Sequence, residues 1–500
     1  MKNTAKRMLL GLLTLSLLLG TVALSGCKLF GEKNVEIETE ANTLGEALET
    51  VDKDDDATLT LPDDLNYGGE DFTVLSYNTM VDEFGNSKSE KPDMIEEALF
   101  NRDSYIEETL DIEFVYNRMN GQFKDKEKFS DTVERSVKAG SQAWDLVGTY
   151  SMVAPNLTLK NVLSDLQTLD YIDFSRAWYP QFMLDASTIN NKTYFITGDM
   201  STNVLYAMQG VAFNATQANA RGIKESKLYQ MVYDNEWTLE ALFEMCEDLG
   251  TELGGDGEWD KNDFYPIITS DDGCIDSFYF CSGLTLINED EDGVLSVSPD
   301  ANSEKVMLIY SMVYDAKHTY RSYYNDATNE TAILEERCIF SISPIFNFRG
   351  HWAESPEQYR ILPFPKFEES DPYRTFLSMW HTQYCIPNDL ENLSRAAAVL
   401  EFLGYASYNY VTPAVFEETM KLRYSVNEDC SNMFDIMRDG RTYGVASLFY
   451  MCFTPGVYWD AHSMFRNAVK NDITNWASHY ESKFAPGLDA VTKQLNEFYA

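Results

Sequence analysis

The chain has 500 residues, of which 44% are apolar and 13% aromatic, so it holds enough apolar material for more than one hydrophobic core. Its 80 acidic residues outnumber the 39 basic ones and give a formal net charge of −41 at pH 7. Because binding to nucleic acid needs clustered Lys and Arg, this composition argues against nucleic acid as a partner.

Residues 1–26 have the pattern of an export signal. Three basic residues precede an apolar run over 8–24 that is interrupted only by Thr and Ser. The run ends in Leu24-Ser-Gly-Cys27, which resembles the bacterial lipobox and implies cleavage before Cys27 and lipid on that residue. An uncleaved anchor is the alternative, but a membrane span needs about 20 apolar residues. We therefore expect a signal peptide over 1–26 and a chain attached through Cys27 to the outer face of the cell membrane.

The segment 27–67 is rich in Asp, Glu and Thr and contains few aromatic residues. Such a segment cannot bury enough apolar surface to order itself. We expect an acidic flexible tether that holds the folded part away from the membrane.

Strands and helices alternate from residue 68 onward. The sequence predicts a strand that begins at Phe72, a helix over 95–110, a strand over 112–116, a helix over 126–139 and a strand over 144–148. This order predicts parallel strands with helices on the sheet faces. Ligands in such sheets bind beyond the carboxyl ends of the strands, which makes Tyr150 and Ser151 candidate ligand residues.

The rest of the chain continues this alternation. Strands are predicted over 192–196, 204–213, 339–345 and 359–362, and the acidic stretch near Asp290 predicts a hairpin turn. Thr238 is a favourable N-cap for a helix that continues to residue 249. Helical patterns dominate the last hundred residues.

Five segments in this order resemble the extracellular solute-binding proteins of ABC importers, family 1, the sugar-binding, maltose-binding-protein-like type. They are Ala143-Trp-Asp-Leu-Val147, Asn191-Lys-Thr-Tyr-Phe195, Val211-Ala-Phe-Asn214, Asn235-Glu-Trp-Thr-Leu-Glu-Ala-Leu242, and Arg360-Ile-Leu-Pro-Phe-Pro365 with the following Ser378-Met-Trp-His381 and Cys385-Ile-Pro387. The resemblance implies an α/β fold of the periplasmic-binding-protein-like type II, with two lobes joined by a multi-crossing hinge around a ligand cleft. It implies a first lobe over 68–212 and 328–392, and a second, helix-rich lobe over 213–327 and 393–500.

The resemblance also implies which residues line the cleft. Aromatic faces pack against sugar rings, and carboxylates and amides bind the hydroxyl groups. The candidates for ligand binding are Tyr150, Ser151, Asp199, Tyr206, Phe346, Asn347, Trp380, Tyr384, Tyr458 and Trp459. Core packing is the alternative for Trp380 and Trp459. A loop residue that bonds to its own backbone is the alternative for Tyr150, Ser151, Asp199, Tyr206, Phe346 and Asn347.

An acidic stretch over 252–263 is a candidate calcium loop. Aligning Gly257 with the sixth position of such a loop places acidic residues at ligand positions. The candidate ligands are Glu252, Asp256, Glu258, Asp260 and Asp263. Gly254 at the third position cannot ligate, so a plain acidic turn is the alternative. No cofactor is required, and the scattered Cys and His residues do not have the spacing of a transition-metal site.

We expect a monomeric, lipid-anchored binding protein that captures an oligosaccharide and delivers it to the permease subunits of an ABC transporter, without enzymatic activity. An extracellular glycoside hydrolase is one alternative, since two carboxylates among 80 acidic residues are easily found. A binding lipoprotein for a non-sugar solute such as a peptide is another. The chain has no Gly-x-Ser-x-Gly, His-Glu-x-x-His or phosphate-loop motif.

Overall fold

The computed structural model describes residues 57–79, 82–85, 92–270, 273–325, 329–347, 349, 358–449 and 462–500. All of them belong to one compact unit, Lys53–Ala500. Cys27, the signal segment, most of the tether, Tyr458 and Trp459 lie outside the described residues.

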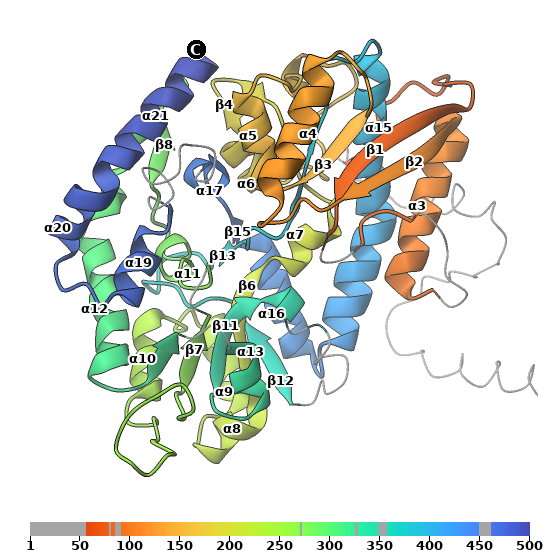
Figure 1. Cartoon of the computed structure of the whole chain (residues 1–500). Coiled ribbons are helices and arrows are strands. Elements are labelled where there is room, and N and C mark those ends of the chain that lie inside the picture. The colour runs from red at the N-terminus through yellow and green to blue at the C-terminus, as the bar shows by residue number, and fades with distance from the viewer. Residues whose placement is uncertain are drawn as a thin grey trace, which may run out of the picture. The chain divides into compact units, whose positions relative to one another are not determined.

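The first sheet is built largely by the N-terminal part of the described chain (Figure 1). Its strand order is β14-β3-β1-β2, with bounds β1 Glu70–Tyr77, β2 Ile112–Met119, β3 Leu146–Tyr150 and β14 Thr382–Cys385. β1 pairs in parallel with β2 and β3, as the predicted βαβαβ order requires. β14 returns from far along the chain and pairs antiparallel with β3, so that Tyr150 is the last residue of β3 instead of the first residue of a loop.

The two predicted helices of this part are confirmed. Asp93 caps α3 (Met94–Leu110) by accepting a hydrogen bond from the Glu96 amide, and Asp111 ends it in a left-handed conformation with φ 51°. α4 (Lys126–Lys138) buries the predicted stripe of Phe129, Val133 and Val137. It packs on α5 (Val153–Leu159), whereas α3 packs against α15 (Leu393–Ala406).

The second sheet has the order β10-β7-β11-β6-β12. Its strands are β6 Gln209–Asn214, β7 Ile267–Thr269, β10 Tyr323–Asn325, β11 Phe340–Pro344 and β12 Tyr359–Leu362. β10, β7 and β11 run parallel, and β6 runs antiparallel between β11 and β12. The structure is thus an α/β fold with two separate helix-covered sheets, as the sequence predicted.

Two strands differ from the expected lobe division. The resemblance places β11 and β12 in the first lobe, within 328–392, but both pair with β6 in the second sheet, which also contains β7 and β10. Conversely, α15 was expected in the second lobe, yet its Arg395 forms ion pairs with Glu70 (2.8 Å) and Asp145 (2.6 Å) beside the first sheet. The positions of β11 and β12 are thus set by strand pairing, and that of α15 is stabilised by ion pairs, in both cases with segments distant in the sequence.

A predicted strand over 204–213 is wrong in its first half. Residues Thr202–Tyr206 form the short helix α7, and the strand β6 begins only at Gln209. All five residues of α7 are buried. Because no face of this helix is exposed, its sequence lacks the alternation of apolar and polar residues that distinguishes a helix from a strand. Two segments that connect the sheets lie side by side here, with Ile196 paired to Tyr384 and Met208 paired to Leu377.

The remaining elements are mostly short helices. They are α6 Gln181–Ser187, α8 Ala215–Ala220, α9 Glu225–Tyr233, α10 Leu239–Cys246, α11 Ser277–Phe280, α12 Glu304–His318, α13 Asn329–Leu334, α16 Glu428–Asp439, α17 Val445–Phe449, α19 Met464–Lys470, α20 Trp476–His479 and α21 Ala485–Tyr499. The 3-10 turns are η2 Leu166–Thr168 and η3 Pro299–Asn302, and the π-helical stretches are η4 Ser407–Val411, η5 Pro413–Arg423 and η6 Tyr480–Phe484. Three two-stranded pairs complete the fold: β4 Thr188–Ile189 with β5 Lys192–Thr193, β8 Ile287–Glu289 with β9 Leu295–Val297, and β13 Thr375–Phe376 with β15 Arg441–Thr442.

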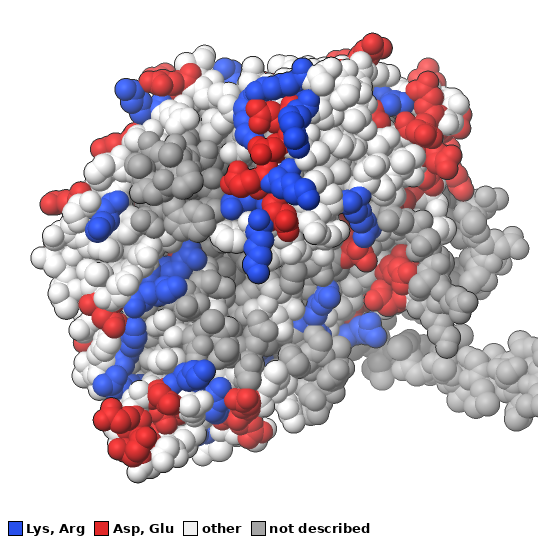
Figure 2. All heavy atoms as spheres, viewed as in Figure 1, with Lys and Arg blue, Asp and Glu red and all other residues white. Residues whose placement is uncertain are grey.

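Several local predictions are confirmed in this part. Thr238 caps α10 by accepting a hydrogen bond from the Ala241 amide, and the acidic stretch near Asp290 is the turn of the β8-β9 hairpin. Across the described residues, no helix combines the length and apolarity that a membrane crossing needs. On the face shown in Figure 2, acidic and basic side chains are interspersed among a larger number of uncharged residues.

Candidate functional site

The main cavity, of about 510 Å³, lies where both sheets and their connecting segments meet. Tyr150 is the last residue of β3 in the first sheet, and Phe123 lies in the turn between β2 and α4. Gln209 begins β6 and Pro344 ends β11 in the second sheet. The segments that follow these strands or precede β14 contribute Phe346, Asn347, Phe376, Leu377, Ser378, Met379 and Trp380. The α11 region, the segment after β15 and α19 contribute Gly273, Cys274, Asp276, Tyr443, His462, Ser463, Arg466, Asn467 and Lys470.

Trp380 is the aromatic centre of one wall of the main cavity. Its ring meets Tyr150 at 5.3 Å and 62°, and Phe346 at 6.4 Å and 72°. Such edge-to-face contacts hold the indole ring in place. Tyr150 is fully buried, whereas Trp380 and Phe346 are only half-buried. The half-buried indole ring can therefore contact a molecule that enters the cavity.

Near-parallel rings form a second aromatic feature, which we name the ring stack: Tyr443, Phe376, Phe280 and His462. Phe376 stacks on Phe280 at 4.6 Å and on Tyr443 at 5.4 Å, and Phe280 stacks on His462 at 5.0 Å. Interplanar angles of 15° to 18° make these contacts nearly parallel. Phe376, Tyr443 and His462 line the main cavity, so the stack is a rigid wall.

Charged side chains form another part of the cavity lining, which we name the charged corner. The buried carboxylate of Asp276 lies 3.0 Å from Nη2 of Arg466 and 3.4 Å from Nε2 of His462. Arg466 and Lys470 are four residues apart in α19, one helical turn, and both line the cavity. Described lining residues therefore include two permanent cations and one carboxylate, in a chain that has twice as many acidic as basic residues.

Amide side chains of the cavity are held by neighbours. Gln209 accepts a 2.7 Å hydrogen bond from the buried hydroxyl of Ser277, and Asn347 donates a 2.8 Å hydrogen bond to Ser343 Oγ. Fixed amides present donors and acceptors at defined positions without further loss of side-chain entropy. The cavity is thus able to recognise hydroxyl-bearing molecules.

Four of the ten sequence-predicted ligand residues line the main cavity, namely Tyr150, Phe346, Asn347 and Trp380. Ser151 lies next to it and donates a 2.6 Å hydrogen bond to the carbonyl oxygen of Met379. The other described candidates lie elsewhere, and Tyr458 and Trp459 are outside the described residues.

Asp199, Tyr206 and Tyr384 are held in the interior and are not among the described lining residues. Asp199 accepts a hydrogen bond from Thr412, and its burial raises the pKa of its carboxyl group. Tyr206 lies in α7, and burial raises its pKa well above the usual value. Tyr384 lies in β14, where burial and the nearby Glu83 raise its pKa.

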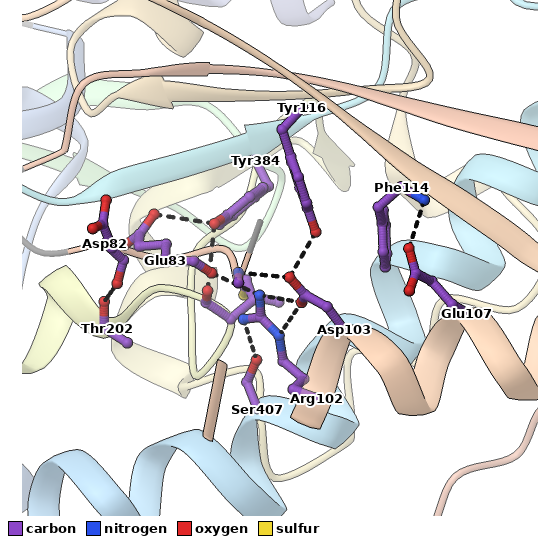
Figure 3. Close-up of polar contacts among 12 residues, drawn as sticks. Asp82, Glu83, Arg102, Asp103, Glu107, Phe114, Tyr116, Thr202, Tyr384 and Ser407 are labelled. Atoms are coloured by element: carbon purple, nitrogen blue, oxygen red, sulfur yellow. Dashed lines mark hydrogen bonds and ion pairs between the residues drawn. The ribbon is translucent and has the colours of Figure 1, made fainter. Parts of the chain in front are cut away.

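A buried polar network holds the segments that connect the two sheets (Figure 3). The carboxylate of Glu83 accepts hydrogen bonds from Ser201, from Asn203 Nδ2 at 2.8 Å and from Tyr384 Oη at 3.1 Å. Ser201 and Asn203 lie at the start of α7 on one connecting segment, whereas Tyr384 lies in β14 of the first sheet, directly after the other. Arg102 donates to the backbone oxygen of Glu83 at 2.6 Å, which ties the network to α3. These bonds fix the segments from which Trp380 projects.

The sequence alone did not indicate the charged corner. Asp276, His462, Arg466 and Lys470 come from segments separated by nearly 190 positions, and none of the predicted motifs contains them. The four-residue spacing of Arg466 and Lys470 was a readable signal of a shared helix face, but it did not indicate what that face contacts.

The acidic loop over 252–263 uses its carboxylates to bond its own backbone. Asp263 accepts hydrogen bonds from the amides of Leu253 (2.8 Å) and Asp260 (2.6 Å), and Asp256 accepts one from Glu258 (2.9 Å). Glu252 and Asp260 also cap nearby amides. Within the described part of the chain, no three His, Cys, Asp or Glu side chains converge to hold a metal ion. Calcium binding by this loop stays a prediction.

Solved structures of other proteins resemble this chain. No model of a known protein family matches the sequence, and no curated protein matches it. One structural neighbour is the galacto-N-biose/lacto-N-biose I-binding protein of the ABC transporter from Bifidobacterium longum, at 12% identity and TM-score 0.56, covering 86% of this chain and 98% of that one. A second is the cyclic α-maltosyl-1,6-maltose binding protein from Arthrobacter globiformis, at 14% identity and TM-score 0.53, covering 86% and 99%.

The chain has the type II periplasmic-binding-protein fold. A third neighbour, UgpB from Mycobacterium tuberculosis in complex with glycerophosphocholine, has 12% identity and TM-score 0.53 and covers 86% of this chain and 99% of that one. Coverage of nearly the whole neighbour in all three cases shows that the likeness extends over both sheets of the type II fold.

Proposed function

We propose that the protein is a lipid-anchored extracellular solute-binding protein that captures an oligosaccharide and delivers it to the permease of an ABC transporter. The main cavity carries this proposal. Its volume of about 510 Å³ is within the 300–1,000 Å³ that is usual for small-molecule sites. The half-buried Trp380, held edge-on by Tyr150 and Phe346, offers an aromatic surface to the C–H face of a sugar ring.

The polar lining supports a hydroxyl-rich ligand. Gln209 and Asn347 are held by side-chain hydrogen bonds, and Ser378, Ser463 and Asn467 add further polar groups. Two of the three structural neighbours described above are named for the sugars they bind. The fold, the aromatic wall and the amides together favour a carbohydrate.

Hydrolysis is a weaker candidate than binding. A glycoside hydrolase needs two carboxyl groups on either side of the scissile bond. The described lining of the main cavity contains one carboxylate, Asp276, and it is engaged with Arg466 and His462. This lining fits capture without turnover.

A non-sugar solute with an anionic group is the second candidate. Arg466 and Lys470 line the cavity, and one neighbour was solved with glycerophosphocholine, which carries a phosphodiester. The two candidates differ in their dependence on Lys470. Replacing Lys470 with Gln should weaken the binding of an anionic solute strongly and the binding of a neutral oligosaccharide only slightly.

The proposal is tested by a thermal-shift panel on the purified protein. Mono- and oligosaccharides, peptides and glycerophosphocholine are added separately, and reducing ends are assayed after each incubation. A ligand at one hundred times its dissociation constant stabilises the folded state by about 2.7 kcal/mol. Stabilisation by an oligosaccharide without release of reducing ends supports the proposal, whereas release of reducing ends or a response only to peptides overturns it.

Attachment to the membrane is tested independently. If Cys27 carries lipid, the wild-type protein sediments with cell membranes, and a Cys27→Ala variant is not lipidated. Mass spectrometry of the mature N-terminus distinguishes the two, and an unmodified Cys27 in the membrane fraction would refute the anchor.

A further inference from the structure

A side cavity of about 250 Å³ lies beside the ring stack of the main cavity. The two cavities share Phe376 and Tyr443 as lining residues, and the side cavity also touches Phe280. The loop after α11 lines it over 283–287, and the segment after β15 lines it over 442–447. Its described lining holds one charged residue, Arg374, and no carboxylate.

Arg374 is placed as an anion anchor. Its Nη1 atom is buried and has no hydrogen-bond partner within the described structure. A buried guanidinium nitrogen without an acceptor is costly, so such groups are normally paired. The chain has 80 acidic residues, and none of those described lines this cavity. Nη1 itself is closed off from solvent, so an anion in the side cavity would meet the other nitrogens of the Arg374 guanidinium group, which is the one charged group among the described lining residues.

Gly283 makes room for the guanidinium group. A Cβ atom at this position would lie 2.8 Å from Cζ and Nη1 of Arg374, and the backbone of Gly283 has φ +78°. Both the space and the conformation favour glycine here. The guanidinium plane consequently lies close against the backbone on one side, which restricts its orientation.

The remaining lining fits a sugar-sized group more closely than a bare ion. Aromatic rings of Phe376 and Tyr443 form one side, and Thr442 and Ser447 supply hydroxyl-bearing side chains. Ser447 Oγ lies 3.3 Å from Nδ1 of His462, which lines the main cavity. Arg binds carboxylates through two parallel N–H donors, a geometry that suits a planar anion.

We propose that the side cavity binds a carboxylate-bearing sugar, a uronic acid, whose carboxylate pairs with Arg374. The inference goes beyond capture of an oligosaccharide in the main cavity and uses different residues. A free uronic acid and a uronic acid at the end of an oligosaccharide share this chemistry.

Calorimetric titration of the purified protein with D-glucuronate, D-glucose, acetate and inorganic phosphate tests the inference. We expect D-glucuronate to bind at least ten-fold more tightly than D-glucose. A disaccharide that ends in glucuronate distinguishes the two sources, because tighter binding than the free acid assigns the site to an oligosaccharide end and weaker binding assigns it to the free acid. If acetate bound as tightly as D-glucuronate, recognition of the sugar ring would be overturned. If phosphate bound as tightly as D-glucuronate or more tightly, the preference for a carboxylate would be overturned.

Variants locate the binding. Arg374→Gln should weaken the binding of D-glucuronate at least ten-fold. Arg374→Lys should weaken this binding less, since the charge remains but the planar pair of guanidinium donors is lost. Arg135→Gln is the matched control, because Arg135 lies exposed on α4 and bonds only within its own helix. Glucuronate binding that is unchanged in Arg374→Gln, or that is absent from the wild-type protein, overturns the proposal.

Two further measurements distinguish loss of glucuronate binding in the side cavity from loss of folding and from binding in the main cavity. Thermal unfolding of Arg374→Gln should not lower the midpoint, since the buried Nη1 makes no hydrogen bond that the substitution could remove. Trp380→Ala, which changes only the main cavity, should leave glucuronate binding intact. A loss of glucuronate binding in Trp380→Ala would place the acid in the main cavity and refute the side cavity as its site.

Discussion

Tyr384 Oη donates a 3.1 Å hydrogen bond to Oε2 of Glu83, and this bond joins residues 301 positions apart in the sequence. Both side chains are buried, and Figure 3 shows the Glu83 carboxylate beside the Tyr384 hydroxyl. The same carboxylate is bonded to Ser201 and Asn203 on the segment around α7. Glu83 therefore links the connecting segment around α7 to β14 of the first sheet. Its position determines how the segment before β14 approaches the main cavity.

Tyr384→Phe should lower the free energy of unfolding by about 1.5 kcal/mol, because a hydrogen bond to a charged acceptor is lost while the ring is kept. Urea denaturation at pH 7 measures this change. Tyr320→Phe is the control, since Tyr320 is 40% exposed. Equal effects of the two substitutions would contradict a special role for the Glu83 bond.

Trp380→Ala should weaken binding of any oligosaccharide identified by the thermal-shift panel by about 2 kcal/mol, which is roughly 30-fold in dissociation constant. The substitution removes the aromatic surface that lines the main cavity. Titration calorimetry measures the change, and Trp259→Ala, which alters a half-buried ring on the acidic loop, is the matched control. A ligand that binds both variants with wild-type affinity does not contact Trp380.

Glu401 should make the protein less stable as pH rises from about 4.5 to about 7. Burial raises the pKa of its carboxyl group from 4.5 to about 7, and Tyr179 donates a 2.7 Å hydrogen bond to it. In this window the folded state holds a proton that the unfolded state has released, so each rise in pH favours unfolding, by about 3 kcal/mol in all. Denaturation of the wild type and of Glu401→Gln at several pH values isolates this contribution.

The difference between wild-type and Glu401→Gln stability should therefore change between pH 4.5 and 7 and be constant above it. A constant difference across the whole range would show that Glu401 ionises normally in the folded state.

His381 should produce the opposite slope on the acidic side. Its Nδ1 donates to the carbonyl oxygen of Ser378 at 2.8 Å, and its Nε2 accepts from Gln383 at 3.2 Å, so the neutral ring has both nitrogens bonded. Burial lowers its pKa from 6.5 to about 4. Between these values the unfolded state binds a proton that the folded state does not, so stability falls by about 3 kcal/mol as pH decreases from 6.5 to 4.

Replacing His381 with Asn supplies an amide N–H donor in place of the ring N–H and removes the titrating group, so the acid-side loss attributed to this residue should disappear. Circular dichroism during urea denaturation at pH 4, 5, 6 and 7 measures it. If the variant and the wild type lose stability in parallel over this range, other groups cause the acid sensitivity.

Local signals in the sequence predicted much of the fold. The four-residue spacing of Phe129, Val133 and Val137 predicted α4 because one helix face is buried and the other is exposed. Thr238 predicted the start of α10 because an N-cap acts within one helical turn. These elements depend on neighbours in the chain, which a single sequence contains.

The parts of the fold that depend on contacts between distant segments could not be predicted from the sequence. The placement of β11 and β12 depends on register with β6, such as Phe340 opposite Phe213, and nothing within those short strands specifies that partner. The candidate site shows the same division. Tyr150 was predicted from its position at the end of the third strand, and Trp380 from the resemblance, which places it near the hinge. Asp276 and Arg466 were missed because their pairing joins segments about 190 positions apart.

The position of Trp380 also has a spectroscopic consequence. Two other tryptophans, Trp178 and Trp237, are fully buried, so their indole surroundings do not change with access of solvent to the main cavity. Trp380 is half-buried and lines that cavity, so displacement of water by a bound molecule changes the polarity around its ring. The protein thereby carries an intrinsic fluorophore at its candidate site, and a shift in emission that is lost in Trp380→Ala reports occupancy without any added label.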